Sequence, residues 1–113
     1  MTQINIPALI KKLIEAGNAY DTATYLSLYH ENAILDDPSV GRKFVGHKGI
    51  REYFESYFIG YKTQTTLMKL EYSSEDAHLE VQFTGDFPGG VVMGTFDFKF
   101  VNGKIAAAKA DLI

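Results

Sequence analysis

The chain contains no cysteine and no tryptophan among its 113 residues, and only three prolines. Without cysteine there can be no disulfide framework, no thiolate metal site and no cysteine nucleophile. The three histidines are too scattered along the sequence to form a metal-binding motif. The sequence therefore predicts a protein that uses neither a metal nor another cofactor.

A strong excess of charge of one sign is also missing, since the formal net charge is −3 at pH 7. This charge gives no overall attraction toward nucleic acid or anionic membranes. The beginning of the chain, MTQINIPALIKK, lacks the basic start and the following apolar run of a secretory signal. No apolar run is long enough to span a bilayer. We therefore expect a cytoplasmic protein that binds neither nucleic acid nor membranes.

Aromatic residues are abundant instead, with seven tyrosines and eight phenylalanines. Aromatic side chains mostly build cores, so the lining of a pocket is a second interpretation of this excess. A chain of this length can form a hydrophobic core without a metal or disulfides. No linker, repeat or low-complexity tract divides it, and we expect a single domain spanning residues 1–113.

The first part of the chain shows the periodicity of helices. Three helices are predicted, over residues 5–19, 23–31 and 47–60. Asn5 is a candidate N-cap for the first helix, and Asp21 or Thr22 for the second. Between the second and third helices we predict a short strand, residues 33–37, and a loop, residues 38–46. The helices therefore occupy the first half of the chain.

After Tyr61 the apolar pattern alternates with a period of two, which indicates strands. Four strands are predicted, over residues 63–73, 77–85, 90–101 and 104–113. Turn signals separate them, so they are expected to form an antiparallel meander. Helices followed by a meander are the pattern of an α+β fold.

The turn between the last two strands can form in two ways. With a two-residue turn at Asn102 and Gly103, Phe98 pairs with Ala107, and the apolar and charged residues mix on one face. With a three-residue loop that keeps Gly103 left-handed, Phe98 pairs with Ala106 and the two kinds of residue separate. Because a slip in register exchanges the faces of a strand, we favour the three-residue loop. The outer face then carries Thr95, Asp97, Lys99, Lys109 and Asp111.

The segment YHENAILDDP, residues 29–38, places two carboxylates beside a proline. The residue before a proline is extended, and successive side chains of a strand point to opposite faces. One of the two aspartates can therefore point inward while the other is solvated. For Asp37 two interpretations stay open: a turn cap that bonds backbone beside Pro38, and a carboxylate that faces a pocket.

The runs LYHENAILDDP, GHKGIREYF and FVNGKI, with three helices before a sheet, resemble the nuclear-transport-factor-2-like superfamily. Its SnoaL-like and ketosteroid-isomerase-like bacterial members are the most similar, and the resemblance covers nearly the whole chain. It implies a cone in which a curved antiparallel sheet wraps the first helix and leaves a pocket at the open end. It also implies a homodimer formed through the outer face of the sheet. The superfamily includes isomerases, cyclases, epoxide hydrolases, dehydratases and non-catalytic binding proteins, so the fold does not settle the activity.

The resemblance implies that Asp37, followed by proline, is the general base of a ketosteroid isomerase, which moves a proton beside a carbonyl. The oxyanion hole of that enzyme is formed by a tyrosine and a protonated aspartic acid. The corresponding positions fall on Leu13 and Phe96, which donate no hydrogen bond. Since losing one such donor costs about 10²–10³ in rate, we do not expect an efficient steroid isomerase.

Other aromatic residues are candidates for the pocket, although for each tyrosine a core ring is the favoured interpretation over a catalytic donor. The predicted pocket lining is Leu13, Tyr20, Tyr29, Tyr53, Phe54, Tyr57, Phe83, Phe96 and Phe98. Our first hypothesis is a protein that binds a small apolar organic ligand in an apolar pocket rimmed by tyrosines. The second is an isomerase, cyclase or hydratase of low specificity with Asp37 as general base. A third is an adaptor that acts through protein contacts and has no pocket.

Overall fold

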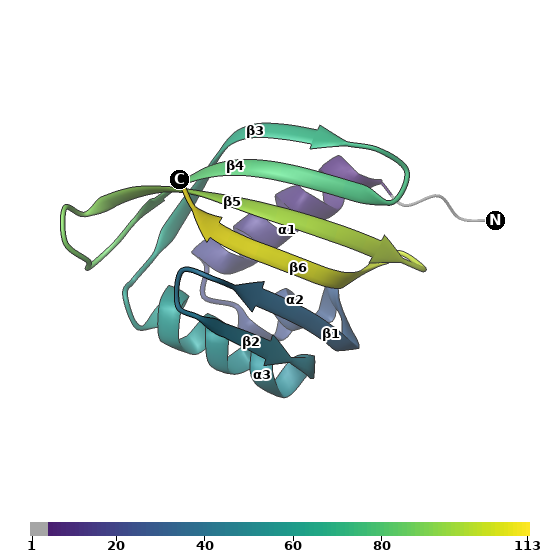
Figure 1. Cartoon of the computed structure of the whole chain (residues 1–113), viewed down its shortest axis with the longest axis horizontal. Helices are drawn as coiled ribbons and strands as arrows, with labels where there is room; N and C mark the ends of the chain where they lie inside the picture. Colours follow the sequence, from purple (N-terminus) through teal and green to yellow (C-terminus); the bar gives the residue numbers. More distant parts are fainter. Residues whose placement is uncertain (1–4) are drawn as a thin grey trace.

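The computed structural model describes residues 5–113, which form an α+β fold of helices packed on one curved sheet (Figure 1). The helical elements are α1 (Ile6–Asn18), α2 (Thr22–Ser27), α3 (Gly46–Phe54) and the π-helical turn η1 (Glu55–Ile59). The strands are β1 (Tyr29–Asp37), β2 (Arg42–Val45), β3 (Gln64–Tyr72), β4 (Asp76–Thr84), β5 (Val91–Val101) and β6 (Lys104–Leu112). The predicted order, helices first and an antiparallel meander second, is confirmed.

The six strands form one sheet in the order β2-β1-β6-β5-β4-β3. The predicted meander from β3 to β6 is antiparallel, and β1 pairs with β6 in parallel. In Figure 1, α1 crosses one face of the meander, while α2 and α3 lie beside β1 and β2. The side of the sheet that faces the helices is called the inner face below, and the opposite side the outer face. Among residues 5–113, no helix has the length and apolar character needed to cross a membrane.

Two predicted helix starts are confirmed by their caps. The Asn5 side chain accepts a hydrogen bond from the Ala8 amide at 3.1 Å. Of the two candidates for the second helix, Asp21 is the cap, because its carboxylate accepts from the Thr24 amide at 3.1 Å. Each cap satisfies an amide that has no partner within its helix.

The stretch between α2 and α3 differs from its prediction in two ways. The second helix ends at Ser27, and β1 already begins at Tyr29, well before the predicted residue 33. Part of the predicted loop forms β2 instead, at the edge of the sheet. The sequence of this strand, RKFV, does not alternate between polar and apolar residues, and the pattern therefore predicted no strand here. In the structure only Phe44 is buried on it. At the start of β1, the pairing of Tyr29 with Ile105 of β6 outweighs the local helical pattern of residues 28–31.

The last hairpin has a two-residue turn, so the predicted three-residue loop was wrong. The predicted separation of apolar and charged residues onto opposite faces is present. Val101 pairs with Lys104 across a two-residue turn, where Asn102 and Gly103 have φ values of 50° and 81°. A bulge next to this turn then shifts the register, so that Phe98 pairs with Ala108. The apolar and charged residues do separate, but the bulge and not the loop achieves it.

A group of fully buried rings between α2 and α3 is called the buried aromatic cluster. It consists of Tyr25, Tyr29 and Phe54, with exposed fractions of 2%, 0% and 0%. The ring centroids of Tyr25 and Phe54 lie 4.3 Å apart in a stacked arrangement. The Tyr29 hydroxyl donates to the Tyr25 hydroxyl at 3.0 Å, so that the polar atoms of the cluster find a partner inside it.

Candidate functional site

A cavity of about 300 Å³ opens at the end of the molecule where β1 and β6 end and the loop from β4 to β5 begins. Its wall combines the end of β1, the helical segment α3–η1 and the meander, and it is mostly aromatic. It is lined by Asp37, Ser39, Val40, Tyr53, Tyr57, Phe58, Tyr61, Thr63, Phe83, Phe87, Pro88, Val92, Thr95, Phe96, Ala110, Asp111 and Leu112. This cavity is the candidate site.

Asp37 is the last residue of β1 and is only 6% exposed. Its Oδ1 accepts hydrogen bonds from the Ser39 amide at 3.0 Å and from the Ser39 hydroxyl at 2.5 Å. Its Oδ2 receives no hydrogen bond from residues 5–113. The carboxylate therefore caps the turn after Pro38 with one oxygen and leaves the other oxygen available at the cavity. Asp36, which pairs with Lys109, is more exposed than Asp37.

The space beside Asp37 comes from a small residue on the neighbouring strand. Because Asp36 pairs with Lys109, the next position of β6, Ala110, is the cross-strand neighbour of Asp37. Ala110 pairs in turn with Phe96 of β5. A methyl group between a carboxylate and an aromatic ring fills little volume. The alternation of alanines and phenylalanines that the sequence shows thus leaves room at this end of the inner face.

Tyr53 reaches the cavity from the last turn of α3 and is 4% exposed. Its hydroxyl makes no hydrogen bond with any residue between 5 and 113. Burial raises the pKa of Tyr53 well above its usual value, and the nearby groups Tyr25, Asp37 and Tyr57 raise it further. The hydroxyl therefore keeps its proton and can donate a hydrogen bond to a molecule in the cavity.

The π-helical turn η1 sets the direction of the next aromatic residues. Its wider turn follows α3 directly and places both Tyr57 and Phe58 at the cavity. The Thr63 hydroxyl donates to the Tyr57 carbonyl at 2.7 Å, which ties the end of this turn to the start of β3. π-helical turns occur frequently at functional sites, and here the turn widens the aromatic wall.

Phe83 forms the opposite wall because the neighbouring strand β5 has a glycine, Gly94, beside its ring. A Cβ added to Gly94 would lie 2.5 Å from the Phe83 ring, so only glycine leaves space for the ring in this position. Edge contacts with Phe58 and Phe96, with centroid distances of 6.1 and 5.9 Å, hold the ring in place. The shape of the cavity therefore depends on Gly94.

The structure brings Asp37, Tyr53, Tyr57, Phe83 and Phe96 together around this cavity. Five other residues of the predicted lining lie outside it: Leu13, Tyr20, Tyr29, Phe54 and Phe98. Tyr29 and Phe54 belong to the buried aromatic cluster, and Leu13 lines a separate void of about 20 Å³ against α1. Tyr20 has a left-handed φ of 56°, and its hydroxyl accepts a hydrogen bond from Gln64 at 2.9 Å. Phe98 is 1% exposed and lies farther along β5 toward the closed end of the sheet.

Several lining residues were missed by the sequence analysis. Phe87 and Pro88 lie in the predicted turn between two strands, Tyr61 lies between the predicted third helix and the strand that follows it, and no periodicity marks such residues as inward. Phe58 lies in the predicted third helix but is not among the predicted pocket residues. One signal was available: an aromatic residue followed by Pro-Gly-Gly, residues 87–90, is an apolar side chain on a flexible loop tip.

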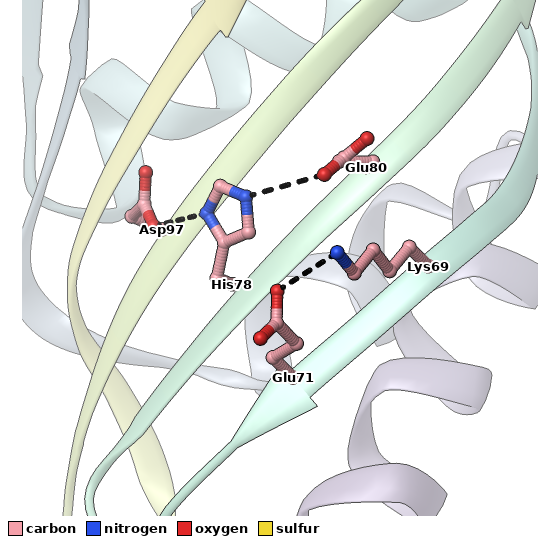
Figure 2. Close-up of polar contacts among 5 residues, drawn as sticks. All are labelled: Lys69, Glu71, His78, Glu80 and Asp97. Carbon is pink, nitrogen blue, oxygen red and sulfur yellow. Dashed lines mark hydrogen bonds and ion pairs between the residues drawn. The ribbon is translucent and has the colours of Figure 1, made fainter.

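The outer face carries a network of charged side chains (Figure 2). His78 lies between two carboxylates, with its Nδ1 2.6 Å from Asp97 and its Nε2 3.9 Å from Glu80. Lys69 pairs with Glu71 at 3.3 Å on the neighbouring strand. A shallow depression of about 670 Å³ on this face is larger than the candidate site. Its ionic groups are largely exposed and most of them form ion pairs on the surface, and therefore we do not consider it the ligand site. Within residues 5–113, no three His, Asp or Glu side chains gather closely enough to hold a metal ion.

Comparison with protein families gives one match that covers most of the chain. The profile described as the SnoaL-like domain matches residues 10–108. The chain belongs to the SnoaL-like domain family. Among proteins with curated functional descriptions, none matches this SnoaL-like chain in sequence.

Solved structures share the fold of this SnoaL-like domain at low sequence identity. An NTF2-like protein of unknown function from Cytophaga hutchinsonii has a TM-score of 0.81 and 17% identity, over 99% of this chain and 93% of its own. A protein with a ketosteroid isomerase-like fold from Catenulispora acidiphila, in complex with trimethylamine, has a TM-score of 0.81 and 13% identity, over 92% and 84%. A Mycobacterium tuberculosis protein in complex with estradiol-17β-hemisuccinate has a TM-score of 0.78 and 14% identity, over 91% and 89%. The likeness confirms the NTF2-like fold and does not extend to the activity of this chain.

Proposed function

We propose that this SnoaL-like domain binds a small organic molecule in the cavity beside Asp37. The observation that carries the proposal is an aromatic-lined cavity of about 300 Å³ that holds a buried carboxylate with one oxygen not hydrogen-bonded by residues 5–113. A pocket of this size with a few convergent polar groups is typical of ligand sites. The adaptor hypothesis of the sequence analysis required no pocket, so the cavity argues against it.

Two structural neighbours support a small-molecule role for the fold. One was solved with trimethylamine and the other with estradiol-17β-hemisuccinate. These molecules differ in size, polarity and charge, so the fold itself does not select one class of ligand. The ligand of this chain must therefore follow from its own lining residues.

A screen by thermal shift, with small aromatics, amines and steroids, tests the proposal. We expect at least one class to raise the melting temperature, because a ligand that binds only the folded state stabilises it. Ala110→Leu fills the space beside Asp37 and should abolish the shift. Ala107→Leu is the matched control, because Ala107 pairs with Lys99 and lies on the outer side of the same strand. A screen without any stabilising compound, or a shift that survives Ala110→Leu unchanged, would contradict a ligand site here.

A second candidate function is proton abstraction with Asp37 as general base. It is favoured by the position of Tyr53, which lines the same cavity and whose hydroxyl has no partner among residues 5–113, so that it can stabilise a developing oxyanion. The oxyanion donors that the resemblance places at Leu13 and Phe96 are absent by residue type, so Tyr53 would have to take over their role. Such a site would act on a small ketone whose carbonyl faces Tyr53 and whose α-carbon faces Asp37.

Deuterium incorporation from D₂O into cyclic ketones and enones, followed by NMR, tests this second function. An enzyme with Asp37 as base should exchange the proton next to the carbonyl, and Asp37→Asn should remove most of the exchange. Asp36→Asn is the control, since Asp36 points away from Asp37 on the same strand. Exchange that is equal in wild type and Asp37→Asn would eliminate the general-base function.

We also propose that a second copy of the chain covers the outer face of the sheet, as the family resemblance implies. The residues concerned are Thr95, Asp97, Lys99, Lys109 and Asp111. Charges of both signs alternate on this face, which suits contact with an identical surface. Light scattering should give twice the chain mass, and Asp97→Arg, on the outer face and outside the cavity lining, should yield the monomer. A monomer in the wild type at high concentration would exclude this interface.

A further inference from the structure

We propose that the ligand of the cavity is a small organic cation, whose ammonium group lies between aromatic rings and the Asp37 carboxylate. This inference rests on the proposed function, because it requires the cavity to be the ligand site. It goes further by naming the chemical class, an amine or quaternary ammonium compound. The charges, the carboxylate and the rings of the lining each support it.

Within residues 5–113, the lining carries negative charge and no positive charge. Its two ionisable acids are Asp37 and Asp111, and no lysine, arginine or histidine is among the lining residues. Asp111 pairs with Thr95, on the outward side of β6, and its Oδ1 accepts from the Leu112 amide at 2.9 Å. Asp37 is therefore the buried carboxylate of the cavity, and Asp111 adds a second negative charge to its lining.

Of the cations that lie near lining residues in sequence, Lys109 is on the outer face of β6, opposite Asp97, while Arg42 and Lys62 are engaged with other groups. Arg42 forms a 2.8 Å ion pair with Glu52, and its guanidinium lies 4.5 Å from the centre of the Phe44 ring. Lys62 lies 4.0 Å from the carboxylate of Asp86 at the surface. None of these three cations lines the cavity. An anionic ligand would thus find no positive partner there, whereas a cation finds an unopposed carboxylate.

The free oxygen of Asp37 requires a partner. A buried carboxylate that loses water without gaining hydrogen bonds is unfavourable, and Ser39 provides donors for Oδ1 alone. A neutral apolar ligand that expels water from the cavity would leave Oδ2 without a partner. An ammonium group supplies a positive charge and, in an amine, an N–H donor. Asp37 therefore selects against apolar ligands and in favour of cations.

The aromatic walls complete the cation site. Seven of the lining residues carry rings: Tyr53, Tyr57, Phe58, Tyr61, Phe83, Phe87 and Phe96. At the mouth, the Tyr57 and Tyr61 rings stack with centroids 6.3 Å apart, and Phe87 meets Tyr61 edge-on at 6.3 Å. The face of an aromatic ring attracts a cation and repels an anion, and quaternary ammonium groups are recognised in this way. Rings and carboxylate thus favour the same sign of charge.

A series of three ligands of almost equal shape tests the inference by calorimetry on the full chain. Choline is the cation, 3,3-dimethylbutan-1-ol is its neutral counterpart, and 3,3-dimethylbutanoate is the anion. We expect choline to bind at least about tenfold more tightly than the alcohol, and the anion to bind most weakly. An alcohol that binds as tightly as choline would overturn the inference and leave the small-molecule site intact. Binding by none of the three would overturn the inference, and the proposed function would then depend on the wider screen described above.

Variants separate the two contributions. Asp37→Asn keeps the shape of the side chain and removes its charge, so choline should lose most of its advantage over the alcohol. Asp36→Asn removes a charge from the other side of the same strand and should leave the advantage unchanged. Tyr61→Leu should weaken choline more than the alcohol, while Tyr72→Leu, an exposed tyrosine outside the cavity lining, should have no effect. A charge preference that survives Asp37→Asn and Tyr61→Leu would place the cation elsewhere and contradict this site.

Discussion

The buried aromatic cluster and the wall of the cavity are built from the same kinds of residue but differ in how their polar atoms are satisfied. In the cluster, the Tyr29 hydroxyl donates to Tyr25, and the Tyr25 ring stacks on Phe54. At the cavity, the Tyr53 hydroxyl and one oxygen of Asp37 find no partner among residues 5–113, although both residues are almost fully buried. Burial alone therefore does not distinguish a core residue from a cavity residue in this protein. The site differs from the core in that its unpaired polar atoms belong to residues that line an open cavity, whereas Thr65 Oγ1, also without a partner among residues 5–113, is buried elsewhere, against α1.

Removing a large ring should separate the two regions most clearly. Phe54→Ala deletes a ring that is 0% exposed and stacked on Tyr25, and we expect it to lower the free energy of unfolding by about 3–5 kcal/mol. Phe87→Ala at the mouth of the cavity should cost less than about 1 kcal/mol, because this ring is partly exposed on a loop. Urea denaturation measures both. Equal losses would show that the mouth is part of the core.

Alkaline pH should affect the buried hydroxyls. Burial raises the pKa of Tyr25 from 10.0 to about 12, and it also raises the pKa values of Tyr29 and Tyr53. The pKa values of these tyrosines are higher in the folded than in the unfolded chain. The free energy that the protonated hydroxyls contribute to folding is therefore fully present below about pH 10. It is lost as the pH rises through the folded values, by about 1.4 kcal/mol per unit of pKa difference. Denaturation at a series of pH values, with Tyr25→Phe for comparison, measures the loss. A wild-type slope above pH 10 no steeper than that of Tyr25→Phe would show that Tyr25 does not contribute.

A methyl group added at Gly94 should displace the Phe83 ring and reduce the volume of the cavity. In Gly94→Ala the new methyl group would meet the Phe83 ring at 2.5 Å, and the ring has to move toward the cavity. We expect a loss of about 1–3 kcal/mol from overpacking and a loss of ligand binding. Gly17→Ala is the control, because its methyl group would meet Phe58 at an ordinary 3.6 Å. Unchanged ligand binding in Gly94→Ala would show that Phe83 does not define the cavity.

Removing a single hydroxyl group from each region, Tyr29 in the cluster and Tyr53 at the cavity, should give the smallest difference in stability. Tyr29→Phe removes the donor that satisfies Tyr25 inside the cluster and should cost about 1 kcal/mol. Tyr53→Phe removes a hydroxyl without a partner in the described part of the chain, so its stability should change by less than about 0.5 kcal/mol. Its ligand affinity should fall instead. A larger loss of stability for Tyr53→Phe than for Tyr29→Phe would reverse our assignment of the two tyrosines.

Much of the fold could be predicted from the sequence because caps and alternation act locally. Asn5 and Asp21 are N-cap residues that indicate where helices begin. The alternation of apolar and polar residues in β4 to β6 indicates which side chains lie on each face of the sheet. The strand β2 and the bulge beside Ala106 could not be predicted, because pairing across the sheet decides them. For the site, alternation indicated that one aspartate of the Asp36-Asp37 pair points inward, and the family resemblance assigned that position to Asp37. The mouth residues Tyr61 and Phe87 lie in turns whose side-chain directions depend on tertiary packing.

The position of a bound ligand tests the central claim most directly. We predict that NOE spectra of the chain with choline show contacts between the trimethylammonium protons and the ring protons of Tyr57 and Tyr61. Asp37→Asn should weaken these contacts strongly, and Asp36→Asn should not. Contacts with residues of the outer face, such as His78, or no contacts at saturating choline would contradict a cation site in this cavity.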